Sequence, residues 1–342
     1  MKVIFFCQNP YAFGILAPIM KVLKKKGYEY IWFIGPKIDS FPFLNEPHTS
    51  EIKILKDFKS DVIFVPGNEV PHYLRGVKTQ VFHGLAGEKK GHFRIRHYFD
   101  LYLTQGPYFT NKFNELKRKY KNFEVIETGW PKLDVFGENK DEYKNQKEDL
   151  LKKYKAKKIV LYAPTFSPSL TSAPYLEHEI KSLASEGDYL IICKFHDLMS
   201  PDLINTYKNI AEESNNIIYE TERNITKFLL ISDILISDTS SVVYEFLLLN
   251  KPVLTFKNDN VKIFWDDAKE YTKLKERVES NLVKDQFKDK RQYIMDNYHP
   301  YSDGKSAKRM VEAVEDYIEN FGVPEKRKLS IYRKHKIKKI FG

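Results

Sequence analysis

The stretch Ser237-Asp238-Thr239-Ser240-Ser241-Val242-Val243-Tyr244-Glu245-Phe246 organises the interpretation of this chain. It follows the apolar run 234–236 and continues into an apolar helical pattern that ends at Asn250-Lys251-Pro252. The pattern predicts a strand that ends, presents three successive hydroxyl residues and becomes a helix. The free N–H groups and partial positive charge of a first helical turn suit a phosphate, and hydroxyls there can donate to it. The stretch therefore indicates a nucleotide-diphosphate site.

Short β-rich runs alternate with amphipathic stretches along the chain and form two series. The first comprises 3–7, 30–34, 62–65, 79–82, 101–104 and 124–127, and the second comprises 159–163, 190–194, 216–219, 234–237 and 253–256. Alternating strands and helices indicate parallel sheets covered on both faces. We therefore expect two Rossmann-like α/β domains with a cleft between them, and ligands beyond the carboxyl ends of the strands.

The composition is that of a globular protein, and 342 residues suit two domains. Cys7 and Cys193 both fall in apolar runs, so we expect buried, reduced thiols of a cytosolic protein. No apolar run approaches membrane-spanning length. The N-terminal residues 1–6 are typical of a first strand, and we expect no signal peptide.

The net charge of +10 is concentrated at the C-terminal end. From Glu325 to Gly342 there are eight Lys or Arg and one Glu, a net +7 (8 − 1). Apolar residues fall roughly on one side of a helix there: Leu329, Tyr332, Ile337, Ile340 and Phe341. Such an end can rest on an anionic membrane surface, whereas a solvated terminus or a helix packed on the body explains the pattern equally well. Nucleic-acid binding is not favoured, because no recognised motif accompanies the charge.

Two histidines directly follow predicted strands. His83 follows Val81-Phe82 and opens a loop with Gly84, Gly87 and Gly91, which permit close approach of the backbone to a ligand. His196, in Lys194-Phe195-His196-Asp197, ends a strand of the second series. A histidine at a strand end can take a proton from an attacking hydroxyl, although each could instead only hydrogen-bond its own turn. We expect the two histidines to face each other across the cleft.

Further polar groups lie at strand ends and helix starts. Thr165 ends the first strand of the second series and could serve a phosphate, although turn chemistry explains this segment too. Glu245 lies one turn into the helix of the opening stretch, where a ribose hydroxyl pair or a lysine would satisfy its carboxylate. Asp303-Gly304-Lys305-Ser306 opens the last long amphipathic stretch, as a phosphate site or a simple cap. We see no metal-ligand spacing, P-loop or dinucleotide fingerprint, and therefore expect no metal and no cofactor.

Together these motifs resemble those of the CDP-glycerol glycerophosphotransferases, the teichoic-acid primases and polymerases. The resemblance rests on 237–247 with Lys251-Pro252-Val253, and on further motifs in family order from about residue 80 to 318: His83-Gly84, Thr128-Gly129-Trp130-Pro131-Lys132-Leu133-Asp134, Tyr162-Ala163-Pro164-Thr165, Lys194-Phe195-His196 and Asp303-Gly304-Lys305. It implies a GT-B architecture. We expect an acceptor-side domain over 1–150, a nucleotide-donor domain over 151–322 and a basic amphipathic tail over 323–342.

The resemblance also implies a reaction, in which glycerol phosphate passes from CDP-glycerol to an acceptor hydroxyl and CMP is released. The acceptor would be a polyol phosphate or a lipid-linked saccharide. By resemblance, His83 is the general base beside the acceptor-side glycines Gly84 and Gly87, and His196 binds phosphate or assists the departure of CMP. The donor-binding set would be Thr165, Lys194, Asp238, Thr239, Ser240, Ser241, Glu245, Asp303 and Lys305. Such an enzyme is cytoplasmic or peripheral on the inner face of the cell membrane.

The acceptor-side loop departs from the family pattern. Family members usually continue the His-Gly motif with Thr-Pro-Leu-Lys, where this chain has Leu85-Ala86-Gly87-Glu88, and they place Pro where it has Asp197. Ribitol phosphate or another CDP-linked polyol therefore stays open as the transferred group.

Two other classes compete with this interpretation. UDP-sugar glycosyltransferases and UDP-N-acetylglucosamine 2-epimerases share the architecture, but epimerase-like sites usually place glycines where this chain has Thr239-Ser240-Ser241. A relative that only binds nucleotide or partner proteins is disfavoured, because both histidines remain.

Overall fold

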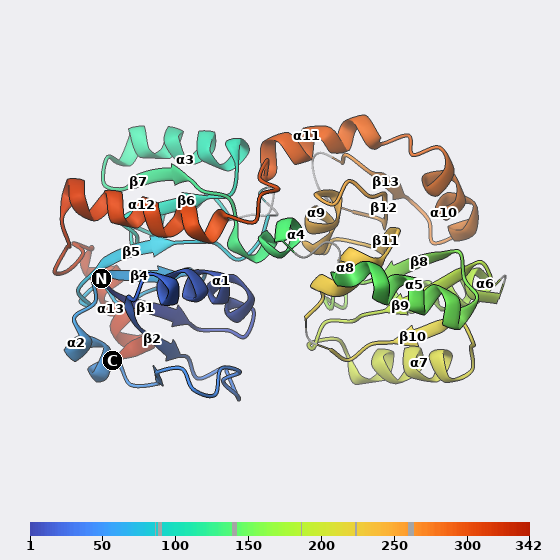
Figure 1. Cartoon of the computed structure of the whole chain (residues 1–342), viewed down its shortest axis with the longest axis horizontal. Coiled ribbons are helices and arrows are strands. Elements are labelled where there is room, and N and C mark those ends of the chain that lie inside the picture. Colours follow the sequence, from blue (N-terminus) through green and yellow to red (C-terminus); the bar gives the residue numbers. More distant parts are fainter. Residues whose placement is uncertain (86, 88–90, 139–141, 186, 223, 259–262) are drawn as a thin grey trace. The chain divides into compact units, whose positions relative to one another are not determined.

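The chain forms two units, each built on one parallel sheet, in the computed structural model of Figure 1. The first unit contains Met1–Glu138 and Asn297–Gly342, and the second contains Asn139–Asp296. The structure describes all residues except 86, 88–90, 139–141, 186, 223 and 259–262. The division differs from the one expected at residues 150 and 322, because the chain returns to the first unit after Asp296.

The sheet of the first unit has the order β3-β2-β1-β4-β5-β6-β7, and all its pairings are parallel. Its strands are β1 (Lys2–Cys7), β2 (Glu29–Ile34), β3 (His48–Thr49), β4 (Val62–Val65), β5 (Val77–Gln80), β6 (Leu101–Thr104) and β7 (Glu124–Glu127). The order reverses between β1 and β4. Such a switch point is where open parallel sheets bind ligands, beyond the carboxyl ends of the strands.

The sheet of the second unit repeats this plan with the order β10-β9-β8-β11-β12-β13, again parallel throughout. Its strands are β8 (Lys158–Tyr162), β9 (Tyr189–Cys193), β10 (Ile217–Tyr219), β11 (Ile234–Ser237), β12 (Val253–Phe256) and β13 (Asp266–Ala268). Here the switch point lies between β8 and β11. The expected class, an α/β fold with two Rossmann-like parallel sheets, is confirmed.

The helices alternate with the strands in both units. They are α1 (Ala12–Lys25), α2 (Ile52–Phe58), α3 (Pro107–Tyr120), α4 (Val135–Glu138), α5 (Glu142–Tyr154), α6 (Glu177–Ser185), α7 (Pro201–Glu212), α8 (Thr226–Ile231), α9 (Val242–Leu247), α10 (Leu274–Val283), α11 (Lys288–Tyr298), α12 (Ser306–Phe321) and α13 (Ile331–Phe341). Two short 3₁₀ helices cover Pro131–Leu133 and Ala173–Tyr175. None of the described helices combines the length and apolar content that crossing a membrane requires.

Buried apolar runs made most of the strands recognisable in the sequence. The strands β4, β6, β7, β11 and β12 coincide with the predicted runs, whereas β5 lies two residues earlier than predicted. The edge strands β3 and β13 were missed, because two or three residues such as Asp266-Asp267-Ala268 carry no apolar periodicity. Cys7 and Cys193 are buried free thiols, as expected, and burial raises the pKa of the Cys7 thiol to about 12.

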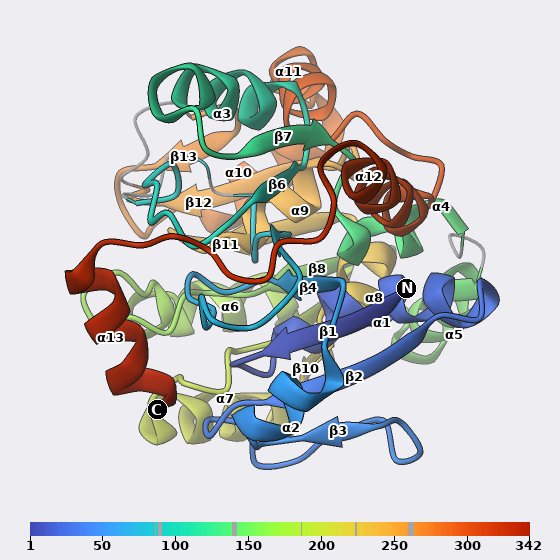
Figure 2. The ribbon, with the colours of Figure 1, turned by 90° about the vertical axis from the view of Figure 1, so that its left-hand side faces the viewer.

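The C-terminal segment is part of the first unit and does not form a free tail. In α12, Met310, Val311 and Val314 are fully buried, and the helix contacts α1. Figure 2 follows the chain from α12 to α13, where Ile337 is fully buried and the ring of Phe341 lies 5.4 Å from that of Phe6. The expected alternative of a helix packed on the body is therefore observed for 325–342, whereas contact of this segment with a membrane stays a prediction.

Arg327 fastens this segment to the first unit. Its guanidinium forms an ion pair with Asp100 and donates to the backbone oxygens of His97, at 2.6 Å, and Asn122, at 2.7 Å. Both side chains of the ion pair are only 9% exposed. Each charge of the pair has lost most of its hydration and is stabilised by the other instead. The loss of either partner would therefore leave a buried charge uncompensated.

We expect Arg327→Met to lower the free energy of unfolding of the first unit by about 3–5 kcal/mol, because Asp100 then stays buried without its cation. Lys326→Met removes the same charge from an exposed neighbour and should change the stability by less than about 0.5 kcal/mol. Urea unfolding followed by circular dichroism measures both. Equal effects of the two variants would contradict the docked arrangement.

Candidate functional site

His83 lies beside the switch point of the first sheet. It is exposed and follows β5, next to Pro66, which follows β4. Its Nδ1 lies 3.1 Å from the carbonyl oxygen of Pro66, and its ring centroid lies 5.4 Å from that of Tyr11, which follows β1. A carbonyl oxygen can only accept, so Nδ1 carries the proton of the neutral imidazole and Nε2 carries the lone pair. The backbone thus sets His83 in the tautomer that a general base needs.

The backbone next to His83 is strained. Phe82 has a φ of 57°, a left-handed conformation that costs an aromatic residue about 1–2 kcal/mol. Two side chains hold the strained turn: Trp130 Nε1 donates to the carbonyl of Phe82 at 3.4 Å, and Gln105 Nε2 donates to the carbonyl of Gly84 at 3.0 Å. The turn is therefore over-determined by its surroundings, as strained functional turns generally are.

Gly87 is the second glycine of the expected acceptor-side loop, and it lies against α3. A Cβ atom there would come within 2.6 Å of the Tyr108 ring and 3.0 Å of the Phe109 ring. Only glycine fits this approach without moving both aromatic side chains. Ala86 and Glu88, which carry part of the departure from the family pattern, lie outside the described residues.

Asp238 ties together the two segments that leave the switch point of the second sheet. It follows β11 and is fully buried. One carboxylate oxygen accepts from the amide of Thr165 at 2.8 Å, and the other accepts from the amide and the hydroxyl of Ser172 at 2.9 and 3.1 Å. Burial raises its pKa above the ordinary value, opposed by these hydrogen bonds. Asp238 therefore shapes the loop after β8, and its carboxylate is already occupied within the protein.

His196 also has its tautomer set by the backbone, in the opposite sense to His83. The amide of Leu198 donates to its Nδ1 at 3.1 Å, so the proton of the neutral ring is on Nε2. Neighbouring segments of the chain partly desolvate the ring and so lower the pKa of the imidazole, and Asp197 partly offsets this shift. The ring lies 4.6 Å from that of Phe166, which brings His196 next to the Thr165 loop. A neutral ring with Nε2–H suits a hydrogen-bond donor to phosphate.

The hydroxyl-rich turn lies at the carboxyl edge of the same sheet. Ser240 and Ser241 are half-buried, and the first helical turn of α9 follows them. Ser241 occupies the N-cap position of α9 and its hydroxyl makes no capping hydrogen bond there. Thr239, at 9% exposure, and Glu245, at 5%, lie deeper. The predicted sequence of strand, turn and helix is confirmed, although α9 covers only Val242–Leu247.

Lys194 is less accessible than a simple phosphate-binding lysine would be. It is 6% exposed, and its ammonium donates to the carbonyl of Phe195 at 2.6 Å. Burial lowers its pKa, with Asp197, Glu220 and Glu222 acting in the opposite direction. Lys194 thus places a cation directly behind the strand end that presents His196.

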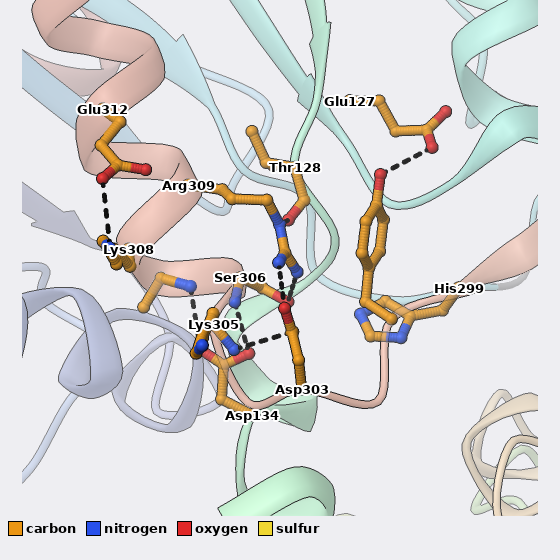
Figure 3. A network of polar contacts seen from close by, with 12 residues as sticks. Glu127, Thr128, Asp134, His299, Asp303, Lys305, Ser306, Lys308, Arg309 and Glu312 are labelled. Atoms are coloured by element: carbon orange, nitrogen blue, oxygen red, sulfur yellow. Dashed lines mark hydrogen bonds and ion pairs between the residues drawn. The ribbon is translucent and has the colours of Figure 1, made fainter.

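Asp303 and Lys305 belong to the first unit and are not in the unit that carries the hydroxyl-rich turn. Figure 3 shows the network around them, in which the segment after β7 receives the start of α12. Asp134 accepts from the amides of Ser306 and Ala307, both at 2.8 Å, and so caps α12 from a distance in sequence. Burial raises the pKa of the Asp134 carboxyl.

Arg309 completes this network. It donates to the carbonyl of Thr128 at 2.8 Å and forms an ion pair with Asp303 at 2.7 Å, which holds the pKa of the Asp303 carboxyl below its usual value. Gly129, with φ 83°, lies so close that a Cβ atom would come within 2.4 Å of Ser306 Oγ. Lys305 itself is exposed. The family motif 128–134 therefore has a structural task here: it holds the start of α12.

Sequence reasoning missed several residues that shape the site: Tyr11, Pro66, Gln105, Trp130 and Arg309. Trp130 lay inside a quoted motif, but its contact with the turn before His83 joins residues 48 positions apart. Gln105 follows β6 directly, so the rule that polar groups after strands line the site would have found it. Pro66 acts only through its backbone oxygen, for which a sequence has no signal.

Two parallel sheets with functional groups at their carboxyl edges define a GT-B-like fold. The solved structure of the wall teichoic acid polymerase TagF shares this fold, with a TM-score of 0.66 and 18% identity over 93% of this chain and 89% of that chain. So does the UDP-GlcNAc 2-epimerase from Neisseria meningitidis, with a TM-score of 0.64 and 15% identity over 92% of this chain and all of that chain (100%). At these identities the likeness shows the fold alone.

The sequence decides the family. Residues 76–316 match the model of the CDP-glycerol:poly(glycerophosphate) glycerophosphotransferases, and the chain belongs to that family. It is 27% identical to the teichoic acid ribitol-phosphate polymerase TarL of Staphylococcus aureus over 71% of this chain and 46% of the relative. It is also 27% identical to the teichoic acid poly(glycerol phosphate) polymerase of Bacillus spizizenii, over 68% of this chain and 57% of the relative. The chain thus matches about half the length of these relatives.

His299 makes the network around α12 sensitive to acid. It is buried and accepts from the amide of Trp130 at 2.9 Å, and burial, with the nearby charge of Arg309, lowers its pKa from 6.5 to about 4. A depressed folded-state pKa contributes stability that is present above pH 6.5 and is lost as the pH falls toward 4. We expect this loss to reach about 3 kcal/mol for the first unit.

Urea unfolding between neutral pH and pH 4 tests this expectation. The His299→Gln variant keeps a polar acceptor but cannot take up the proton. The slope of its unfolding free energy against pH should therefore be smaller than that of the wild type, by an amount that corresponds to the uptake of up to about one proton. His335→Gln, at an exposed position of α13, should keep the wild-type slope. Identical slopes for His299→Gln and the wild type would show that His299 does not titrate on unfolding.

Proposed function

We propose that this chain transfers a polyol phosphate from a CDP-linked donor, CDP-glycerol in the first instance, to an acceptor hydroxyl with release of CMP. The observation that carries the proposal is the family match over 76–316, which includes both histidines and the hydroxyl-rich turn. The relatives named above make poly(ribitol phosphate) or poly(glycerol phosphate). By analogy, we infer a role in the synthesis of a teichoic-acid-like polymer, with a polyol-phosphate or lipid-linked saccharide acceptor.

The tautomers of the two histidines support opposite roles in this transfer. His83 Nε2 takes the proton of the acceptor hydroxyl, and the oxygen attacks the β-phosphorus of the donor. The new P–O bond forms as the bond between the β-phosphorus and the bridging oxygen breaks, and that oxygen leaves with the electron pair as part of CMP. His196 Nε2–H donates to a phosphate oxygen that gains charge in the transition state.

The donor's pyrophosphate is held by donors that are fixed before it binds. The amides and hydroxyls of Thr239, Ser240 and Ser241 contact the phosphates, with the cation of Lys194 behind them, and Glu245 accepts from the ribose hydroxyls. Asp238 acts through the loop of Thr165 by fixing its backbone. Preorganised dipoles of this kind lower the barrier because they need no rearrangement during the reaction.

A thermal-shift panel tests the donor class. CDP-glycerol or CDP-ribitol at 100 times its dissociation constant should stabilise the native state by about 2.7 kcal/mol and raise the melting point, whereas UDP-N-acetylglucosamine should not. A Ser240→Ala/Ser241→Ala variant should lose most of the CDP-glycerol shift, and His83→Ala should keep it. A preference for uridine nucleotides would overturn the proposal in favour of a UDP-sugar enzyme. When CDP-glycerol and CDP-ribitol are compared at one common concentration, the larger shift identifies the preferred polyol.

Substitution by glutamine separates the two histidine roles. His83→Gln should lower turnover of CDP-glycerol by about 10²–10⁴-fold, because an amide cannot accept the proton. His196→Gln retains an N–H donor near the Nε2 position and should lose less turnover than His196→Ala. Both histidines are exposed, so unchanged melting points are the control for folding. Wild-type turnover in His83→Gln would contradict the assigned base.

We also propose that the chain works at the cytoplasmic face of an anionic membrane. The simple form of this idea, with the apolar side of 325–342 against lipid, does not fit the packing, because Ile337 and Phe341 face the core of the first unit. The residues of α13 that stay exposed include Ile331, Tyr332 and Ile340, beside several lysines. Membrane contact would therefore use the outer side of α13 and its neighbours.

A further inference from the structure

A basic pocket lies between α2 and α13 in the first unit. Its volume is about 400 Å³, and its lining is formed by Lys56, His72, Tyr73, Ile331, Lys334, His335, Lys338 and Gly342. The α13 members 331, 334, 335 and 338 follow the i, i+3, i+4, i+7 spacing of one helix face. The other face of α13, which carries Ile337 and Phe341, packs into the core. The fold thus turns one face of α13 inward and leaves the basic face to the pocket.

Within the part of the chain that the structure describes, the lysines of the pocket have no carboxylate partners. Among the described residues, none of Lys56, Lys334 and Lys338 forms an ion pair, whereas their neighbour Lys336 pairs with Glu69. Three ammonium groups thus line the pocket, and Gly342 lies beside them. The pKa of His72 is lowered by its burial and by the charges of Lys334, Lys78 and Lys326, which reflects the positive potential around the pocket.

The pocket is also built to keep its shape. The hydroxyl of Tyr73 donates to the backbone oxygen of Gly342 at 2.9 Å. The ammonium of Lys56 lies over the Tyr73 ring, 4.5 Å from the ring centroid, in a cation–π contact. The amide of Arg327 donates to the carbonyl of His72 at 2.9 Å. These contacts fix the residues that flank α13 in the sequence to the loop of His72 and Tyr73 and hold the Lys56 ammonium over the Tyr73 ring.

Large apolar side chains accompany the pocket on α13. Ile331, which lines it, is 86% exposed, and Tyr332 is 78% exposed. Exposed aliphatic and tyrosine side chains beside unpaired lysines are the composition of an interfacial surface, where lysines attract anionic headgroups and apolar groups enter the headgroup boundary. A soluble anion would use the lysines but not these apolar groups.

We propose that this pocket binds the phosphodiester headgroup of an anionic phospholipid, with Ile331 and Tyr332 entering the membrane interface beside it. The inference rests on the proposed function insofar as that places the chain at a membrane. In this proposal the headgroup phosphate contacts Lys56 of α2 and Lys334 and Lys338 of α13. Each lysine near an anionic surface strengthens partition about fivefold, so the three together are expected to contribute roughly 100-fold.

Vesicle flotation of the full chain tests the site. The wild type should float with vesicles of phosphatidylcholine mixed with phosphatidylglycerol and not with phosphatidylcholine alone. Lys56→Gln/Lys334→Gln/Lys338→Gln should lose roughly 100-fold in partition. The matched control Lys53→Gln/Lys328→Gln/Lys339→Gln removes the same charge from exposed positions outside the pocket and should lose far less. Unchanged melting points would establish that both variants fold.

Three results would overturn the proposal: no flotation of the wild type, equal losses in the two triple variants, or pocket-dependent binding of soluble poly(glycerol phosphate) that Ile331→Ser/Tyr332→Ser leaves unchanged. The last result would identify the polymer as the occupant. The CDP-glycerol thermal shift is measured on the same variants. A normal shift without flotation contradicts only the pocket, and flotation without a shift contradicts only the transferase.

Discussion

The parallel direction of every strand is the constraint on which the functional arrangement depends. Parallel strands bring all their carboxyl ends to one edge, and a reversal of strand order separates the loops at that edge. In the first unit this places Pro66 and Tyr11 around His83. In the second it brings Thr165, His196 and the turn 239–241 to the same edge, because β8 lies between β9 and β11. Residues more than 70 positions apart, such as Thr165 and Asp238, thus become neighbours.

Backbone groups then decide what each histidine can do. The two imidazoles are chemically identical, but a carbonyl oxygen faces Nδ1 of His83 and an amide N–H faces Nδ1 of His196. One ring therefore presents a lone pair at Nε2 and the other presents a proton. In the proposed transfer, the lone pair of His83 serves as the base and the N–H of His196 serves as the hydrogen-bond donor to phosphate.

The sequence predicted the sheets well and the site in part, for a physical reason. Buried parallel strands are continuous apolar runs, so β4, β6, β7, β11 and β12 were located to the residue, and the polar groups after them followed from topology. The occupied carboxylate of Asp238 and the tautomers could not be predicted. They depend on which backbone amide or carbonyl stands opposite a side chain, and this is set by loop geometry that leaves no pattern in composition or spacing.

The return of the chain to the first unit shows the same limit at the level of domains. The pattern of α12 is a generic amphipathic helix that would suit either sheet. Its place is selected by Asp134, whose carboxylate satisfies the free amides of Ser306 and Ala307, and by Gly129, whose missing side chain admits Ser306. The motif 128–134 therefore forms the binding surface for the start of α12. A motif shared by a family can thus have a structural role. Because α13 follows α12 in the same unit, the contact between the motif 128–134 and α12 also determines where the basic face of α13 lies.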